Sequence, residues 1–234
     1  VSGDRMYIVQ LTNIVKIYED KNKVPVQALN KVRLNVENGE FTAIAGPSGS
    51  GKTTLLNIMG GLDQPTSGSV TVAGKDLTTL KRNDLAEFRL KTLGFVFQAF
   101  NLIPVLTAEE NAEFMLLLQG IDAKERHQRV KAEFNELGIG EDLLHRRPNE
   151  LSGGQQQRVA VARALVSHPK LILADEPTAN LDSKTGRMLL DKMKEMNEKK
   201  GVTFIFSTHD PMVMERARRL IILRDGQIVE DHNN

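Results

Sequence analysis

The sequence contains no cysteine and no tryptophan, and its positive and negative charges nearly cancel. Without cysteine, the chain forms no disulfide, no thiolate metal site and no cysteine nucleophile. Its 31 basic and 30 acidic side chains leave a formal net charge of +1, so no overall field draws the protein to nucleic acid or anionic lipid. We therefore expect no nucleic-acid partner, and any membrane role has to come through a protein partner.

Long apolar runs are also missing. No segment approaches the roughly 18 to 20 apolar residues that a membrane-spanning helix needs. Residues 1–6 lack the charged and apolar regions of a signal peptide. These absences predict a cytoplasmic location. The content of 40% hydrophobic and 26% charged residues is that of an ordinary folded domain, and 234 residues suffice for one core with a smaller lobe.

The spacing of apolar residues predicts an α/β fold with a helical insertion. Residues 33–36 alternate as a half-buried strand does, which indicates an antiparallel edge before the turn at residues 38–39. Helical spacing and a capping box at residues 107–110 then replace the strand signals, until strands and helices alternate again. We predict a single domain over residues 1–234, with its core at about 1–97 and 166–234 and a helical subdomain at about 98–165.

A glycine-rich motif follows the apolar run at residues 41–45. Residues 46–53 match the pattern GxxxxGK[ST] between a predicted strand and a predicted helix, a context that disfavours a merely flexible turn. Glycines let successive backbone N–H groups turn toward phosphate oxygens, and the helix N-terminus adds partial positive charge. Lys52 can reach the β- and γ-phosphates, and the Thr53 hydroxyl is placed to bind Mg²⁺. The residues expected to bind the nucleotide here are Ser48, Gly49, Ser50, Gly51, Lys52, Thr53 and Thr54.

Two carboxylates follow the apolar run at residues 171–174. Ligands bind at the carboxyl edge of a parallel sheet, so Asp175 and Glu176 should face the same crevice as the phosphate loop. Asp175 is expected to hold Mg²⁺ through water, because Mg²⁺ keeps much of its hydration shell. Glu176 points differently and is the candidate general base for the attacking water. The alternative is a solvated acidic pair that ends a strand.

A second glycine motif, residues 151–155, reads Leu-Ser-Gly-Gly-Gln and precedes a predicted helix at residues 156–165. A serine and paired glycines at a helix start make another anion cradle, although a simple helix cap is the alternative. One chain needs only one cradle for each γ-phosphate, so the second is expected to serve a nucleotide held elsewhere. Together with the phosphate loop, this motif resembles the ATP-binding cassette (ABC) proteins, and the resemblance covers nearly the whole chain.

The resemblance to ABC ATP-binding subunits implies a RecA-like P-loop NTPase core with a mostly parallel sheet, an antiparallel β subdomain and an inserted helical subdomain. It implies ATP and Mg²⁺ as cofactors, and ATP hydrolysis coupled to transport. It also implies that two copies of the chain pack head to tail around ATP. The residues of one copy that would contact the ATP of the other are Ser152, Gly153, Gly154 and Gln155.

The resemblance assigns further residues that their patterns alone do not. Tyr18 stands where the family has an aromatic that stacks on adenine, and Gln98 where a glutamine contacts Mg²⁺ and the attacking water. His209 stands where a histidine binds the γ-phosphate, and Asp182 belongs to the loop that crosses the dimer interface. Taken alone, each would more often be structural or a surface residue. The expected catalytic residues are thus Glu176, His209 and Gln98, and the expected metal ligands are Thr53, Gln98 and Asp175.

Three segments, residues 98–111, 154–158 and 174–182, resemble the branch of lipoprotein-releasing, macrolide-exporting and cell-division ATPases. That branch implies a separate integral membrane permease, which would place the chain on the inner face of the cytoplasmic membrane. We expect a groove beside Gln98 and residues 100–106 to receive a short helix of the permease, because exposed Phe100, Leu102 and Ile103 would otherwise be an unexplained apolar patch. The alternative is that these three residues pack inside the helical lobe. Two alternatives stay open: a regulator of a membrane complex that moves no substrate, and a soluble ABC ATPase of DNA repair or translation.

Overall fold

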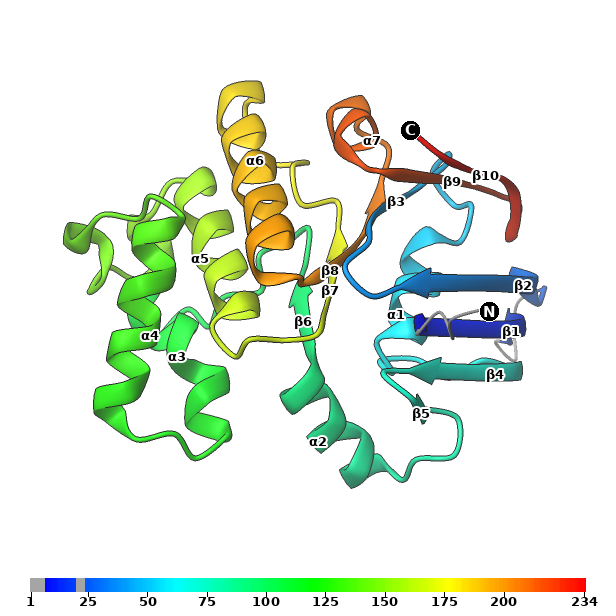
Figure 1. The fold of residues 1–234 in the computed structure, drawn as a ribbon, viewed down its shortest axis with the longest axis horizontal. Helices are drawn as coiled ribbons and strands as arrows, with labels where there is room; N and C mark the ends of the chain where they lie inside the picture. Colours follow the sequence, from blue (N-terminus) through cyan, green and yellow to red (C-terminus); the bar gives the residue numbers. More distant parts are fainter. Residues whose placement is uncertain (1–6, 20–23) are drawn as a thin grey trace, which may run out of the picture.

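A computed structural model describes residues 7–19 and 24–234, so the prediction made for residues 1–6 lies outside the described residues. Figure 1 shows the arrangement of its elements. The strands are β1 (Tyr7–Tyr18), β2 (Val26–Glu37), β3 (Phe41–Ala45), β4 (Ser67–Val72), β5 (Lys75–Asp76), β6 (Leu93–Val96), β7 (Leu171–Asp175), β8 (Thr203–Thr208), β9 (Arg219–Arg224) and β10 (Gln227–Asn233). The helices are α1 (Lys52–Met59), α2 (Arg82–Thr92), α3 (Ala108–Leu118), α4 (Ala123–Glu136), α5 (Gly153–Leu165), α6 (Ser183–Lys200) and α7 (Pro211–Arg216), with 3₁₀ turns at Glu141–Leu143 and Pro148–Glu150.

The larger sheet has six strands in the order β10-β9-β3-β8-β7-β6. The strands from β9 to β6 pair in parallel, and β10 closes the edge as an antiparallel hairpin with β9. In the registers of β3 with β8 and of β7 with β8, Ala45 lies opposite Thr208 and Asp175 opposite Ser207. The carboxyl ends of three neighbouring strands are therefore aligned, at the edge where α/β proteins bind ligands. The predicted, mostly parallel sheet is confirmed.

The smaller sheet is antiparallel, with the strand order β2-β1-β4-β5. Along β2, Val32, Leu34 and Val36 are buried while Arg33 and Asn35 are exposed, as the alternation in the sequence predicted. The buried face shares one hydrophobic cluster with α1 and with one face of the large sheet. The helix that follows the phosphate loop is thus held between the two sheets (Figure 1).

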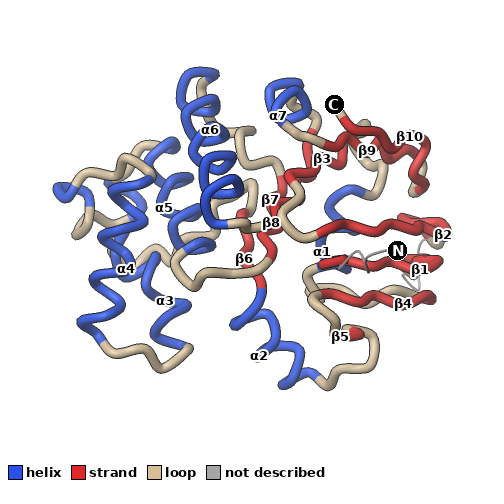
Figure 2. Tube along the Cα trace, in the orientation of Figure 1, coloured by secondary structure: helices blue, strands red, loops and turns tan. Residues whose placement is uncertain are grey.

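Helices α3, α4 and α5 gather beside the β6 edge of the large sheet, on the left in Figures 1 and 2. The predicted capping box of α3 is present, with Glu110 N donating to Thr107 Oγ1 and Thr107 N donating to the Glu110 carboxylate. Val130 and Phe134 of α4 are buried in a cluster that continues to Phe206 of β8. Because this core is shared with the sheet, our boundary between core and helical subdomain stays a prediction.

Candidate functional site

The phosphate loop leaves β3 and closes against the start of α1. Gly51 has a φ of 103°, and a Cβ built there would lie 2.5 Å from Ala28 O. A Cβ on Gly46 would lie 2.0 Å from Leu223 O. Both positions therefore admit only glycine, because any side chain would meet backbone that cannot move aside. The loop is fixed by close backbone packing on β2 and β9.

Lys52 is the first residue of α1, and its side chain turns back into the loop. It is only 8% exposed, and its Nζ donates to Gly46 O at 2.8 Å and to Pro47 O at 3.0 Å. The ammonium group therefore lies within the loop that would surround a phosphate. A triphosphate could take the place of these two carbonyl acceptors, and it would form stronger, charge-assisted hydrogen bonds with the lysine.

A cavity of about 500 Å³ opens over this loop. It brings together residues predicted from three distant segments, because Gln98, Glu176 and His209 line it along with the phosphate loop. The predicted phosphate-loop residues that line it are Ser48, Gly49, Gly51, Lys52, Thr53 and Thr54. Ser50 belongs to the loop but is buried, and its Oγ has no hydrogen-bond partner among the described residues. One concave site thus collects the groups that phosphoryl transfer requires.

Thr53 and Asp175 supply oxygen atoms side by side. The Thr53 hydroxyl donates to Asp175 Oδ2 at 3.0 Å and lies 3.3 Å from Oδ1. Within residues 7–19 and 24–234, no group of three or more His, Cys, Asp or Glu is arranged to hold a metal ion. This set nevertheless fits Mg²⁺, which is typically held by one or two protein oxygens together with phosphate oxygens and water. Gln98, the third predicted ligand, lies at the cavity wall.

Glu176 has different partners from Asp175: its carboxylate contacts the end of β8 and the residue after it. Its carboxylate accepts from the Thr208 hydroxyl at 3.3 Å and from His209 N at 3.4 Å, and Oε1 lies 2.6 Å from His209 Nδ1. Glu176 has a φ of 47°, a left-handed conformation that costs a non-glycine residue on the order of 1 kcal/mol. The backbone bond from Glu176 N to Ser207 O helps to hold this turn. The strained turn separates the two carboxylates and pairs Glu176 with His209.

The second glycine motif forms the start of α5, which begins at Gly153 and not at residue 156 as predicted. Ser152 Oγ accepts from Gln155 N at 3.3 Å, and the Gln155 side chain accepts from Ser152 N at 2.8 Å, which completes a capping box. A Cβ on Gly154 would lie 2.9 Å from the side chain of Thr185. The start of α5 therefore packs on the start of α6. Residues 152–155 do not line the described part of the phosphate-loop cavity.

Asp182 caps α6 beside this motif. Its Oδ1 accepts from the backbone N–H groups of Lys184 and Thr185 at 3.0 Å each, and its Oδ2 accepts from the Thr185 hydroxyl at 2.6 Å. The bonds from Thr185 lower the pKa of Asp182 below its usual value. Asp182 also lies outside the lining of the phosphate-loop cavity, as do Tyr18 and Asp175. The predicted residues therefore divide into two groups within one chain, one around Lys52 and one at the starts of α5 and α6.

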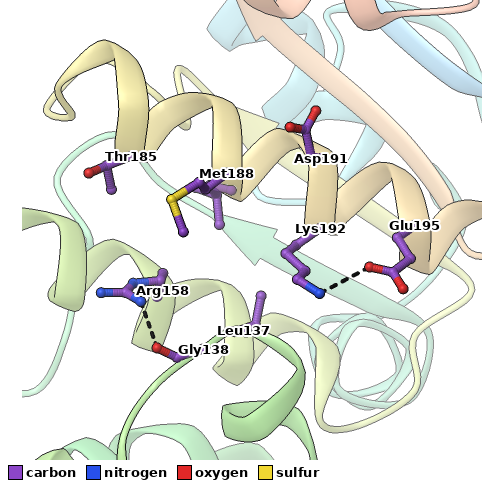
Figure 3. Close-up of a pocket in the computed structure, with 9 residues that line it drawn as sticks. Leu137, Gly138, Arg158, Thr185, Met188, Asp191, Lys192 and Glu195 are labelled. Atoms are coloured by element: carbon purple, nitrogen blue, oxygen red, sulfur yellow. Dashed lines mark hydrogen bonds and ion pairs between the residues drawn. The ribbon is translucent and has the colours of Figure 1, made fainter.

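A separate cavity of about 300 Å³ lies between α5 and α6, where Figure 3 shows Met188 above Leu137. Its charged side chains already have partners. Arg158 donates to Gly138 O at 2.7 Å, and Lys192 donates to Glu195 at 3.1 Å. This cavity contains none of the residues predicted for catalysis or nucleotide binding, and we assign it no function.

Sequence reasoning missed two residues that support the site. Asn111 of α3 is fully buried; its side chain accepts from Ile103 N and donates to the carbonyl groups of Ile103, Leu106 and Thr107. It therefore fixes the loop that follows Gln98, and a lone asparagine within an apolar helical pattern was the available signal.

Asp210 is the other missed residue. It caps α7 through Met212 N and accepts from the Thr178 hydroxyl at 2.6 Å. Thr178 follows Glu176 and Asp210 follows His209, so this bond connects the two loops that carry the base and the histidine. The charged N-cap pattern Asp-Pro at residues 210–211 was visible in the sequence, but its partner was not.

Comparison with known proteins decides the family. A family model described as "ABC transporter" matches residues 29–179, which is more than half of the chain. The chain belongs to the ABC transporter family. The match includes the phosphate loop, the second glycine motif and both carboxylates. This ABC protein is therefore an ATP-binding cassette with ATPase activity, as its motifs predicted.

Relatives support the branch that the motifs indicated. The cassette is 45% identical over 222 residues to an uncharacterized ABC transporter ATP-binding protein, YknY of Bacillus subtilis, and the match covers 95% of each chain. It is 47% identical over 224 residues to the macrolide export ATP-binding/permease protein MacB of Brucella melitensis. That match covers 96% of this cassette but 34% of MacB, so the cassette spans about a third of MacB.

Solved structures agree with the fold. The ATP-binding cassette MJ0796 of Methanocaldococcus jannaschii, in a dimeric post-hydrolysis state bound to ADP and Pi, has a TM-score of 0.91 at 43% identity. The match covers 96% of this cassette and 98% of that chain. A second solved structure, also described as dimeric, matches equally well. The α/β class and the P-loop NTPase fold are thereby confirmed.

Proposed function

We propose that two copies of this cassette enclose ATP between them and drive a membrane permease by binding and hydrolysing it. One observation carries the proposal: the cavity around Lys52 holds the phosphate loop and the candidate base, while the second anion cradle at Ser152 lies outside it. Because residues 152–155 do not line the phosphate-loop cavity of their own chain, we expect them to contact the nucleotide of a neighbouring copy. The dimeric structures of MJ0796 support this arrangement.

The residues of the cavity can carry out hydrolysis as follows. Backbone N–H groups of the loop and Lys52 bind the β- and γ-phosphates, and bound Mg²⁺, held by Thr53 and Asp175, would offset the phosphate charge. Glu176 takes a proton from the attacking water as its oxygen bonds to the γ-phosphorus. The bond from this phosphorus to the bridging oxygen breaks, which leaves ADP and phosphate. His209 orients Glu176 through the contact at Nδ1 and, as a residue of the cavity wall, would also contact the γ-phosphate.

ATP binding can drive closure only if ATP binds more tightly to the closed dimer than to the separated cassettes. Residues 152–155 of the partner supply that difference, since they would contact ATP only in the closed form. Hydrolysis removes the bridging γ-phosphate, and the two cassettes can then separate.

Turnover should therefore depend on protein concentration. Because each complete site needs two chains, we expect the rate of phosphate release per chain to rise with concentration and then to level off once dimers predominate. Replacing Ser152 with alanine should lower the plateau while leaving the ATP affinity of the isolated chain unchanged, because Ser152 does not touch the cavity of its own chain. A rate per chain that stays constant down to the lowest measurable concentration would argue for a complete site in the monomer.

An apolar groove lies beside β6 and α3. A cavity of about 260 Å³ is lined by Phe97, Ile103, Phe114 and Met115, with Arg163 at its side. Of the three apolar residues predicted to form this surface, only Ile103 lines the cavity. Leu102 packs against the main hydrophobic cluster, so the packing alternative holds for that residue.

We propose that this groove receives a short apolar segment of the permease. Changing Phe114 to aspartate should leave basal ATP hydrolysis unchanged and abolish its modulation by the membrane partner, because an ionised carboxylate cannot be buried in an apolar contact. The matched control is Leu118→Asp, the same kind of change at a residue that is 55% exposed at the end of α3. The measurement is ATPase activity with and without the detergent-solubilised partner, after thermal unfolding has shown that both variants fold. Equal coupling in both variants would exclude the groove.

The membrane association of the cassette follows from this partner in our proposal. No helix in the described ranges is both long and apolar enough to cross a bilayer. We therefore propose that the cassette sits on the inner face of the cytoplasmic membrane through the permease. The similarity to MacB, a macrolide export protein, supports a transporter over a regulator that moves no substrate.

A further inference from the structure

The end of β1 carries an aromatic ring that is held from two sides. Lys16 and Tyr18 are two residues apart on one strand, so their side chains share a face. The Lys16 ammonium lies 4.8 Å from the centre of the Tyr18 ring. The Tyr18 hydroxyl donates to Asp63 Oδ2 at 2.7 Å, and Lys16 Nζ donates to Asp63 Oδ1 at 2.6 Å. One carboxylate thus fixes both side chains.

Asp63 is itself firmly placed in the turn after α1. Its backbone N–H donates to Asn57 O at 3.2 Å, and its Oδ1 accepts from Gln64 N at 2.7 Å. Lys16 also donates to Gln64 O at 2.8 Å. Burial opposes ionisation of Asp63, but the hydrogen bonds from Lys16 and Tyr18 outweigh it and hold the pKa of Asp63 below its usual value. The carboxylate is therefore a charged anchor that connects β1 to the helix of the phosphate loop.

The anchored ring lies at the rim of the phosphate-loop cavity. Tyr18 is 43% exposed and pairs across the sheet with Val26, which is 61% exposed and lines the cavity. The Tyr18 hydroxyl is also 3.5 Å from the hydroxyl of Thr54, another residue of the cavity wall. An exposed ring beside an exposed valine offers a flat apolar surface at the end of a phosphate site. A planar aromatic base is the ligand group that such a surface fits.

We propose that Asp63 and Lys16 are positioning residues for purine binding, which hold the Tyr18 ring in its stacking orientation before the nucleotide arrives. The inference rests on the proposed function, because it takes the cavity to bind ATP. Lys16 lies over one face of the ring, and in this proposal the base stacks on the other face. A ring fixed in advance loses less side-chain freedom when the base binds, so its anchor contributes to affinity without touching the ligand.

The prediction distinguishes weaker binding of the base from weaker binding of the phosphates. Stacking on one aromatic side chain changes affinity by about fivefold to a hundredfold. We expect Asp63→Ala to weaken ATP binding at least several-fold and to leave the binding of inorganic tripolyphosphate unchanged. Lys16→Met should act in the same direction, and Asp63→Asn, which keeps an acceptor for the tyrosine hydroxyl, should recover part of the loss. Glu87→Ala, which removes a carboxylate paired with Lys91 on the surface of α2, is the matched control.

The pKa of the Tyr18 hydroxyl can be measured by spectroscopy and reports the contact between Tyr18 and Asp63. The sequence has two tyrosines, so in a Tyr7→Phe background the ultraviolet titration of phenolate reports Tyr18 alone. Burial raises the pKa of Tyr18 above its usual value, and the bond to Asp63 and the charge of Asp63 raise it further, against a lowering contribution from Thr54. Removing Asp63 should therefore lower this pKa. A purely structural role for Asp63 elsewhere in the turn would leave the titration unchanged.

The experiment distinguishes failure of the inference from failure of the function on which it rests. If the unaltered protein binds neither ATP nor tripolyphosphate, the proposed function is wrong. If Tyr18→Ala leaves ATP affinity unchanged, the ring does not bind the base and the inference is wrong. If Tyr18→Ala weakens ATP binding but Asp63→Ala and Lys16→Met do not, the two are not positioning residues. Equal weakening of ATP and tripolyphosphate by Asp63→Ala would also overturn the inference, because it would indicate general damage to the site.

Discussion

Replacing Glu176 with glutamine should lower the rate of ATP hydrolysis by a factor on the order of 10² to 10⁴, while ATP binding is retained. The amide has nearly the same shape and can still accept from the Thr208 hydroxyl, so the turn after β7 should persist. It cannot take a proton from the attacking water. Phosphate release under saturating ATP measures the rate, and equilibrium binding measures the affinity.

The matched control for this variant is Glu198→Gln, which alters an exposed carboxylate paired with Arg218. That substitution should leave hydrolysis at the level of the unaltered protein. Near-normal hydrolysis by Glu176→Gln would show that another group activates the water. Because Asp175 is turned toward Thr53, the role would then have to pass to a residue outside the acidic pair.

Replacing Lys52 with alanine should weaken ATP binding by about tenfold to a hundredfold, the range expected when one or more hydrogen bonds to a charged group are lost. The ammonium group is the only protein cation that the described cavity wall places inside the loop. Its loss removes the one positively charged side chain that residues 46–53 bring to the β- and γ-phosphates. Displacement of a fluorescent ATP analogue gives the dissociation constant directly.

Lys91→Ala, which removes an exposed cation from α2, is the control for lost positive charge. It should bind ATP as the unaltered protein does. An unchanged dissociation constant for Lys52→Ala would place the triphosphate somewhere other than this loop. Since Lys52 hydrogen-bonds the loop carbonyl groups of Gly46 and Pro47, thermal unfolding has to confirm that the loop variant still folds.

Local patterns in the sequence predicted the strand β3, the loop after it and the start of α1, because each depends on neighbouring residues. The alternation in β2 and the capping box of α3 were predictable for the same reason. The start of α5 was not. Glycine is unfavourable in the interior of a helix, so the paired glycines indicated a later start. The reciprocal hydrogen bonds between Ser152 and Gln155 instead cap the helix at Ser152, and Gly153 and Gly154 form its first turn.

The unpredicted contacts connect residues far apart in the chain. Asp63 lies 45 residues from Tyr18, and no pattern in either segment indicates that the two meet. The loop after Gln98 could not be placed from the sequence for a similar reason: Arg163, 63 residues from Phe100, donates a hydrogen bond to Phe100 O. Leu102 and Ile103 are both partly buried, but Leu102 packs against the hydrophobic cluster whereas Ile103 lines the groove, a difference that depends on tertiary contacts.

The central claim is that Lys52 of one copy and Ser152 of its partner contact the same ATP. The most direct test is the molar mass of Glu176→Gln in solution with ATP and Mg²⁺, measured by light scattering beside the nucleotide-free protein. We predict a dimer with ATP and a monomer without it. A protein that binds ATP fully and yet remains monomeric at high concentration would contradict the claim.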